Sequence, residues 1–157
     1  MSNLNRVVPA LAVALAGMFF GIAAYINLAE QPARLALAAG PMLAQWKISF
    51  AAGITIQGAL AVVTGLVGLL AWWLSRDKSW LIGGVLMLAN WPWTLVMIAP
   101  VNAALNATAP DAAGASSVAM IAQWGQLHAV RTVFGLCALL VFIWAITRDH
   151  RRAKHAV

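Results

Sequence analysis

Four long runs of apolar residues dominate the chain, and short polar or proline-containing segments separate them. The runs cover residues of about 7–28, 50–74, 80–100 and 129–147, and each is long enough as a helix to cross the hydrocarbon layer of a bilayer. A transmembrane barrel would instead show shorter strands of alternating polarity. The pattern therefore predicts an all-α fold: a membrane-embedded, antiparallel four-helix bundle that forms a single domain over residues 1–157.

The second and fourth helices are predicted to be longer than a membrane requires. Pro41 suits the first turn of a helix, so the second helix is expected to begin near residue 41 and to continue to residue 74. The fourth is expected to begin near residue 117, with Ser116 or Ser117 as its cap. Both helices would then extend beyond the membrane on the non-cytoplasmic side.

Prolines and polar residues predict where the chain bends or turns. Gln31-Pro32 is expected to end the first helix, with a short surface helix over residues 33–39, and Pro92 is expected to kink the third span. The short segment 75–79 forces the second and third spans to run antiparallel. Residues 101–117 are predicted to form the only long loop, lying over one end of the bundle.

Composition and charge support membrane insertion. With 63% hydrophobic and 9% charged residues, the chain has more apolar surface than a soluble domain of 157 residues can bury. The net charge of +6 does not indicate nucleic acid, because the basic residues lie at the ends of the apolar runs. Most of them, including those of the basic tail 148–157, fall on the side of the termini, so both termini are predicted to be cytoplasmic.

Two features of the apolar runs concern packing. Ala14, Gly17, Gly21 and Ala24 share one helical face, which would allow another helix to approach closely. That helix would belong either to the same bundle or, through Gly17 and Gly21, to a second copy in a homo-oligomer. The single cysteine, Cys137, is expected to be buried, and it excludes a disulfide framework or a cysteine-rich metal site within one chain.

The candidate site begins with Trp124, His128 and Arg131, whose spacing of i, i+4 and i+7 places them on one helical face. Ionisable residues at membrane depth are costly, so a functional role is the default hypothesis. The predicted topology brings the polar ends of all four helices together in an outer-leaflet pocket, open to an apolar small molecule from the lipid. The candidate lining consists of Tyr25, Asn27, Glu30, Trp46, Lys47, Gln57, Asn102, Trp124, His128 and Arg131. The mid-span amide of Asn90 is expected to find a partner on another helix.

Three roles for His128 are compatible with the sequence. It can act as a general base, with Arg131 stabilising the resulting oxyanion. It can ligate haem or a metal, although no companion ligands have recognisable spacing. It can also serve only as a structural hydrogen-bonding residue. Arg131 needs an anion, which either Glu30 or an acidic substrate would supply.

These residues also carry a resemblance. Pro100-x-Asn102-x-x-Leu105, followed by Trp124-x-x-x-His128-x-x-Arg131-Thr132 and preceded by Glu30-x-Pro32-Ala33-Arg34, resembles the anthrone oxygenase-like family of small four-helix membrane proteins. The resemblance implies oxidation of an anthrone-like compound to a quinone by dioxygen, with no obvious cofactor motif.

By that resemblance Asn102, His128 and Arg131 are the expected catalytic residues, and Trp124 packs against an aromatic substrate. The other candidate substrate-binding residues are Trp46, Glu30, Gln57, Tyr25 and Asn90. A haem- or metal-binding redox protein that uses His128, and a non-catalytic ligand-binding or accessory membrane subunit, remain the alternatives.

Overall fold

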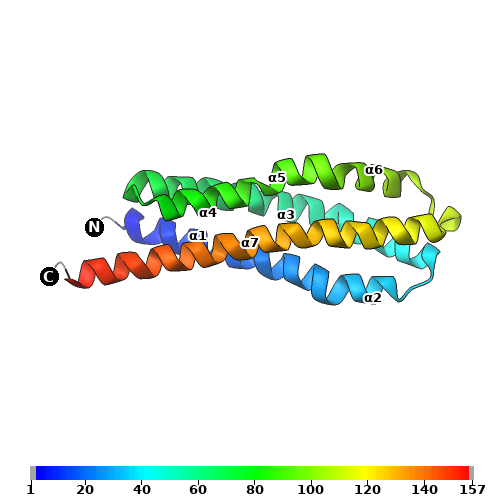
Figure 1. Ribbon diagram of the computed structural model, residues 1–157, viewed down its shortest axis with the longest axis horizontal. Coiled ribbons are helices and arrows are strands. Elements are labelled where there is room, and N and C mark those ends of the chain that lie inside the picture. Colours follow the sequence, from blue (N-terminus) through cyan, green and yellow to red (C-terminus); the bar gives the residue numbers. More distant parts are fainter. Residues whose placement is uncertain (1–2, 156–157) are drawn as a thin grey trace.

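A computed structural model describes the backbone of residues 3–155 and the side chains up to Arg148. The described residues form an antiparallel bundle of long helices without strands. The first helix begins and the last helix ends at the same end of the bundle (Figure 1). The first helical rod comprises α1 (Leu4–Tyr25), a π turn η1 (Ile26–Glu30) and α2 (Gln31–Leu35), and α3 (Ala39–Ser75) follows it. The predicted all-α four-helix architecture is confirmed.

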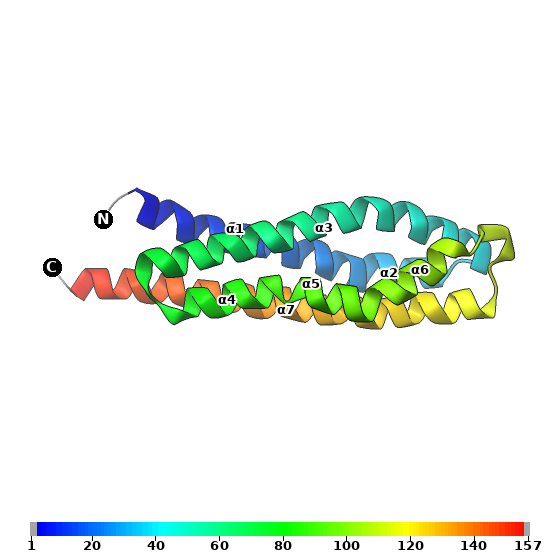
Figure 2. The same cartoon turned by 90° about the horizontal axis from the view of Figure 1, so that it is seen from above.

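The third rod is the most segmented, and the fourth is a single helix. The third comprises α4 (Lys78–Leu88), α5 (Asn90–Trp93), a second π turn η2 (Thr94–Ile98) and α6 (Ala99–Ala107). A short 3₁₀ turn η3 (Pro110–Ala112) leads to α7 (Ala115–His155). Figure 2 shows α7 running alongside the whole length of the third rod.

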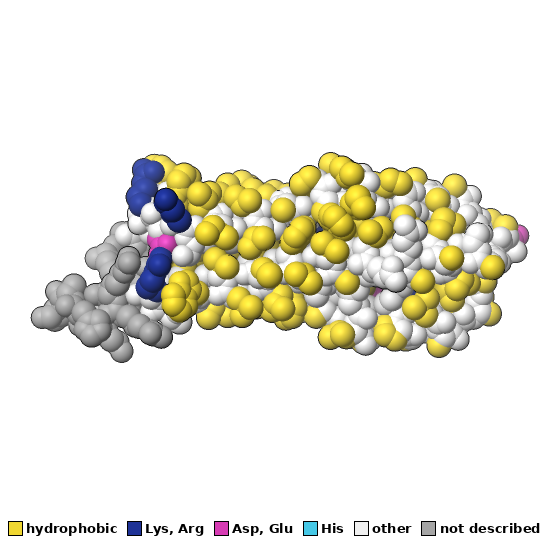
Figure 3. All heavy atoms as spheres, in the orientation of Figure 1, with side chains coloured by type: hydrophobic (Ala, Val, Ile, Leu, Met, Phe, Trp, Pro, Cys, Tyr) yellow, Lys and Arg dark blue, Asp and Glu magenta, His cyan; other side chains and the backbone are white. Residues whose placement is uncertain are grey.

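Four helical stretches are long and apolar enough to cross a membrane: Leu4–Leu35, Ala39–Ser75, Lys78–Ala107 and Ala115–Arg148. Hydrophobic side chains are spread along the whole length of the visible surface, and Lys and Arg gather at the end that holds the termini (Figure 3). The chain is therefore a multi-pass membrane protein. The cytoplasmic placement of this end stays a prediction, and the side chains of the basic tail beyond Arg148 lie outside the described residues.

The predicted break of the first helix at Gln31-Pro32 was wrong. Pro32 does not end the first helix, because it lies in the first turn of α2, where its missing N–H is not required. The helix continues to Leu35, so no separate helix covers residues 33–39, and the chain turns at residues 36–38. Pro41 likewise lies in the first turn of α3, which begins at Ala39.

The predicted long loop over residues 101–117 was also wrong. Pro100 lies in the first turn of α6, which continues to Ala107, and α7 begins at Ala115. A proline in the first turn favours helix, and the alanines that follow it are strong helix formers. Lys47 holds the connection that remains, because its ammonium group donates to the carbonyl oxygens of Asn106 at 2.9 Å and Thr108 at 2.6 Å.

The third rod is interrupted before Pro92, as the sequence predicts. A proline at this position cannot donate to the carbonyl of Leu88, and α4 ends at that residue. Asn90 stabilises the interruption from within its own helix, because its side-chain NH₂ donates to the carbonyl oxygens of Met87 at 3.0 Å and Leu86 at 3.3 Å. The predicted interhelical partner for this amide was therefore wrong.

Glycines bring the helices close together in the half of the bundle that holds the termini. A Cβ atom added to Gly68 would lie 3.0 Å from the Cα atom of Gly84, so α3 and α4 pack backbone against backbone. A Cβ at Gly83 would lie 2.3 Å from the ring of Phe142, which stacks on Trp80 with a centroid separation of 5.3 Å. This half has no room for larger side chains at these positions.

The face of Gly17 and Gly21 does not form the predicted close contact within the bundle, and the alternative contact with a second copy stays a prediction. Ala14 and Gly21 are exposed, and an added Cβ at Gly21 would meet nothing within 4 Å, so this face is not a close contact within the bundle. The buried face of α1 consists of Val8, Ala12, Ala16, Phe19 and Ala23. Cys137 is exposed rather than buried. Both bundle-facing and lipid-facing surfaces of a membrane helix are apolar, so hydrophobicity alone does not distinguish them.

Candidate functional site

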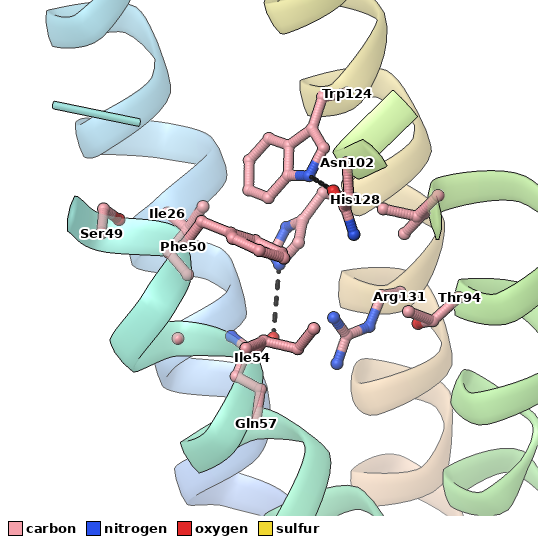
Figure 4. A pocket seen from close by; sticks show the side chains of 12 residues that line it. Ile26, Ser49, Phe50, Ile54, Gln57, Thr94, Asn102, Trp124, His128 and Arg131 are labelled. Carbon is pink, nitrogen blue, oxygen red and sulfur yellow. Dashed lines mark hydrogen bonds between the residues drawn. The ribbon is translucent and has the colours of Figure 1, made fainter. Parts of the chain in front are cut away.

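The helices separate around a pocket in the half of the bundle farther from the termini. The pocket holds about 390 Å³ of empty space, including its open mouth. It is lined by Ile26, Ser49, Phe50, Gly53, Ile54, Gln57, Thr94, Ile98, Asn102, Trp124, His128 and Arg131. These side chains come from all four rods and surround one space (Figure 4).

Both π turns contribute to this pocket. Ile26 belongs to η1, and Thr94 and Ile98 belong to η2. A π turn widens a helix locally and occurs frequently at functional sites. Helix α3 packs extensively against α4 and makes few contacts with the third rod beyond the kink. The wider turns and the kink therefore coincide with the place where the bundle opens.

His128 is almost fully buried, with 2% of its surface exposed, and both ring nitrogens face side-chain amides. Its Nδ1 atom lies 2.8 Å from Oδ1 of Asn27, and its Nε2 atom lies 3.3 Å from Oε1 of Gln57. Asn27 comes from η1 and Gln57 from α3, so three helical rods position this ring. Neither neighbour is charged.

Trp124 forms one wall of the site and orders several neighbours. Its ring stacks on His128 with centroids 4.9 Å apart, and its Nε1–H donates to Oδ1 of Asn102 at 2.9 Å. The guanidinium of Arg34 lies over the Trp124 ring, 5.6 Å from the ring centroid. Trp46 approaches Trp124 edge-on at 6.0 Å. The imidazole is thus part of a packed aromatic and cationic stack.

Arg131 has no acidic partner among the described residues. Its guanidinium points into the pocket in Figure 4, and its Nε atom is buried without a hydrogen-bond partner. The guanidinium carbon lies over the ring of Phe19, 5.7 Å from its centroid. A cation with 8% of its surface exposed and no counter-ion is ready to bind an anionic oxygen.

Glu30 pairs with Arg34 rather than with Arg131, so the predicted Glu30–Arg131 pair was wrong. Arg34 donates to Oε1 of Glu30 and to Oε1 of Gln31, both at 2.6 Å. Gln45 and Ser49 also hydrogen-bond to Glu30. The pair has i, i+4 spacing, which favours contact on one helix, whereas Arg131 comes from another rod.

Of the nine residues predicted to be catalytic or substrate-binding, the structure brings five together at the pocket and keeps four apart from its surface. Gln57, Asn102, Trp124, His128 and Arg131 all line the pocket. The others are placed differently: Glu30 lies in the Arg34 network, Trp46 lies behind Phe50 and Trp124, Asn90 lies in the kink, and Tyr25 is 65% exposed on the outside of the bundle.

Sequence reasoning missed several residues around the site. The pocket-lining residues Phe50, Ile54, Thr94 and Ile98 are apolar or weakly polar and carry no distinguishing pattern. Arg34 was named only as part of a motif and not as a site residue, although it is only 2% exposed. Its i, i+4 spacing from Glu30 was the one signal that could have found this pair.

Few side chains near His128 could bind a metal ion. The described residues contain no group of three or more His, Cys, Asp or Glu side chains that could hold a metal ion. The two ring nitrogens of His128 face amide groups instead. Ligation of a metal or haem iron by His128 would have to displace Asn27 or Gln57 and take its other ligands from outside this set.

Comparison with known proteins identifies the family. A family model described as anthrone oxygenase matches residues 46–141. This segment begins at Trp46 and includes Gln57, Asn102, His128 and Arg131. No curated protein and no solved structure matches the chain. Because the matched segment covers more than half of the chain and carries most of the pocket lining, the chain belongs to the anthrone oxygenase family.

Proposed function

We propose that this chain is a membrane oxygenase that deprotonates an acidic carbon of an aromatic, apolar substrate and lets the resulting anion react with dioxygen. One observation carries the proposal: an imidazole and an uncompensated guanidinium, His128 and Arg131, line the same mainly apolar pocket. A base removes the proton, and a fixed cation stabilises the oxyanion into which the negative charge delocalises. The family assignment supports the same class of chemistry.

The proposed reaction converts a CH₂ group beside two aromatic rings into a carbonyl group. Nε2 of His128 takes one proton, and the carbanion is stabilised as an oxyanion beside Arg131. Dioxygen adds to the carbon, and the imidazolium returns the proton to give a hydroperoxide. Loss of water, which takes the second C–H proton and breaks the O–O bond, leaves the carbonyl. One dioxygen molecule is consumed, and one quinone and one water molecule are formed.

Gln57 suits both protonation states of His128. Its amide oxygen lies 3.3 Å from Nε2 of His128, which is the arrangement that an imidazolium N–H requires. The amide nitrogen of Gln57 has no other partner in the described structure. Rotation of the amide by about 180° would let this NH₂ group donate to the lone pair of a neutral imidazole. Gln57 can therefore keep a hydrogen bond with Nε2 of His128 in both protonation states of the ring.

The other lining residues bind and orient the substrate in this proposal. Phe50, Ile54 and Ile98 provide apolar contacts, and Trp124 provides an aromatic face. Asn102 accepts a hydrogen bond from Trp124, which leaves its NH₂ group for a substrate oxygen. Ile54 is 43% exposed on a surface that lipid would cover, so we propose that the substrate enters from the bilayer. With cytoplasmic termini, this pocket lies in the outer leaflet.

The experiment uses the full chain in lipid nanodiscs with anthrone and dioxygen as the probe. Quinone absorbance and oxygen uptake measure turnover, and labelling with ¹⁸O₂ should place one oxygen atom in the new carbonyl and the other in water. We expect His128→Ala to lower turnover by about 10²- to 10⁴-fold. Cys137→Ala, on the exposed surface, is the matched control and should retain full turnover.

Two outcomes would overturn the proposal. Turnover by His128→Ala at the wild-type rate would exclude His128 as the general base. Binding of anthrone without any oxygen uptake by the wild-type protein would favour a ligand-binding subunit. A visible spectrum of the purified protein is measured in parallel, and a Soret band lost in His128→Ala would assign His128 to haem instead.

A further inference from the structure

Asn27 joins His128 to two other groups, although it lies outside the family-matched segment 46–141. It is placed by η1, from which its side chain reaches α7. Its NH₂ group donates to the carbonyl oxygen of Gly125 at 2.9 Å. Its Oδ1 atom lies 2.8 Å from Nδ1 of His128 and 2.7 Å from the hydroxyl of Thr132.

These contacts fix the direction of the Asn27 amide. The carbonyl oxygen of Gly125 can only accept hydrogen bonds, so the NH₂ group of Asn27 must face it. The opposite orientation would place the two oxygens against each other with no hydrogen between them. Oδ1 of Asn27 therefore faces His128, and a carbonyl oxygen at 2.8 Å requires a proton on Nδ1.

Thr132 supports the same arrangement from the next turn of α7. Its hydroxyl lies 2.7 Å from Oδ1 of Asn27 and 3.5 Å from the backbone oxygen of His128. A hydroxyl has one proton, and the shorter contact with Asn27 takes it. The amide oxygen then accepts from both Thr132 and His128, so rotation of the Asn27 amide would break both contacts together with the bond to Gly125.

We infer that Asn27 and Thr132 form a positioning pair that holds His128 as the Nδ1–H tautomer and directs the lone pair of Nε2 toward the pocket. The partner of one ring nitrogen decides which nitrogen is free to act, and a base with the proton on the wrong nitrogen cannot take one from a substrate in the pocket. The catalytic consequence rests on the proposed function, because it requires His128 to be the base. The tautomer itself does not.

The direct test is the ¹⁵N spectrum of the histidine ring in full-length protein labelled with ¹⁵N-histidine. The signals of His128 are assigned by their loss in His128→Gln, which separates them from those of the other histidines, His150 and His155. We expect a protonated Nδ1 and an unprotonated Nε2 in the ligand-free protein. A protonated Nε2 with a bare Nδ1 would overturn the inference, whatever the activity.

Substitutions at Asn27 test the same inference through catalysis. Asn27→Leu removes the acceptor at similar volume, so the population of the Nδ1–H form should fall and kcat for anthrone should drop by about 10- to 100-fold with little change in KM. Asn27→Asp keeps an oxygen facing Nδ1 and should keep that nitrogen protonated. If Asn27→Leu leaves both the tautomer and kcat unchanged, the pair does not position the base.

Thr132→Val provides a smaller change that preserves the shape of the bundle. It removes only the hydroxyl, and we expect about a 3- to 10-fold fall in kcat and a mixed tautomer. Thr147→Val is its control on the same helix, because Thr147 is exposed and bonds only to carbonyls one turn earlier. Equal effects of the two valine variants would contradict the positioning role.

The two proposals fail in distinguishable ways. An Nδ1–H tautomer that depends on Asn27, combined with normal turnover in His128→Ala, would retain the positioning pair and reject the base. Loss of turnover in His128→Ala, combined with a tautomer that does not change when Asn27 is replaced, would retain the base and reject the positioning pair.

Discussion

The two halves of the bundle solve opposite packing problems. In the half that holds the termini, glycines let α3 and α4 meet backbone to backbone, and Phe142 fills the space over Gly83. In the other half, two π turns and the kink before Pro92 accompany a pocket that contains an unpaired arginine. The comparison indicates that tight packing in one half provides a rigid frame for a polar cavity in the other.

Charge is handled differently in the two halves as well. Asp77 and Arg148 form an ion pair at the end of the bundle that holds the termini, where water can solvate their exposed parts. Glu30 and Arg34 pair inside the opposite half, and Arg131 there has no acidic partner within the part of the chain that the structure describes. A buried charge without a partner lowers stability. We therefore expect the half that holds the pocket to be less stable than the half that holds the termini, because its charge serves function.

The largest expected effect comes from Arg131→Met, which separates activity from stability. Turnover of anthrone should fall by about 10²- to 10³-fold, because the oxyanion loses its fixed cation. The thermal midpoint should rise, because the variant removes a buried charge that has no counter-ion. Oxygen uptake and thermal unfolding in nanodiscs measure the two effects. A fall of both quantities would mean that Arg131 mainly braces the helices.

Glu30→Gln should give the largest loss of stability. It leaves the guanidinium of Arg34, which is 1% exposed, without its counter-ion, and removal of one partner of a buried pair costs about 3–5 kcal/mol. The double variant Glu30→Gln with Arg34→Met should recover part of this loss. Unfolding free energies of the two single variants and the double variant test this expectation. An additive cycle would indicate that the two side chains are not coupled.

Gly84→Ala and Gly53→Ala form a matched pair across the two halves. A Cβ at Gly84 would lie 3.0 Å from the carbonyl oxygen of Gly65 and 3.2 Å from the backbone nitrogen of Leu69, so Gly84→Ala should cost about 1–3 kcal/mol. A Cβ at Gly53 meets nothing within 4 Å. Gly53→Ala should therefore raise stability by about 0.5–1 kcal/mol through helix propensity. Thermal unfolding of both variants checks the contrast, and equal changes would contradict it.

The smallest effect is expected at the end that holds the termini and depends on pH. Burial raises the pKa of the Asp77 carboxyl, but hydrogen bonds from Arg148 and Ser79 outweigh burial and bring the pKa below its ordinary value. The lowered pKa therefore stabilises the fold above the unfolded value of about 3.9, and the contribution is lost as pH falls through the folded value.

Asp77→Asn should accordingly cost about 1 kcal/mol at pH 7 through the lost ion pair with Arg148, since asparagine can still cap α4 where Asp77 accepts from the backbone N–H of Ser79 at 2.9 Å. The difference from wild type should shrink below about pH 4. Unfolding measured across pH checks this expectation. A difference that stays constant down to pH 3 would assign the whole effect to shape rather than charge.

The sequence predicts the frame of this molecule better than the details of its site. Continuous apolar length was sufficient to identify the spans, and helical spacing was sufficient to place Trp124, His128 and Arg131 on one face. Gln57 was identified because a polar amide deep in an apolar run is costly unless it has a hydrogen-bonding partner or a function. These predictions depend on distances along a single helix, which the sequence contains directly.

The failures concern which way a side chain turns and which helix it meets. Tyr25 and Asn27 are two residues apart and therefore lie on nearly opposite sides of a helix, so only one of them can face the pocket. Tyr25 faces outward, and Asn27 reaches His128. The choice depends on the rotation of the first helix, which its uniformly apolar sequence does not indicate. Likewise, Arg34 pairs with Glu30, and Arg131 has no acidic partner among the described residues. Which arginine obtains the carboxylate depends on how all four rods pack.

The π turns have a consequence for how such a pocket can change. Each turn, Ile26–Glu30 and Thr94–Ile98, accommodates more backbone per revolution than the α-helix around it, so the rod can absorb an additional residue there without lengthening by a full turn. Removal of one residue from such a turn would restore an α-helical turn and draw in the backbone beside the pocket, with little rotation of the rest of the rod. For the first rod, this change would move Ile26 and Asn27 relative to His128 while leaving the glycine-packed half in register. Single-residue insertion and deletion at these two turns, more than substitution, is the kind of change that would give the cavity a new shape and keep the same frame.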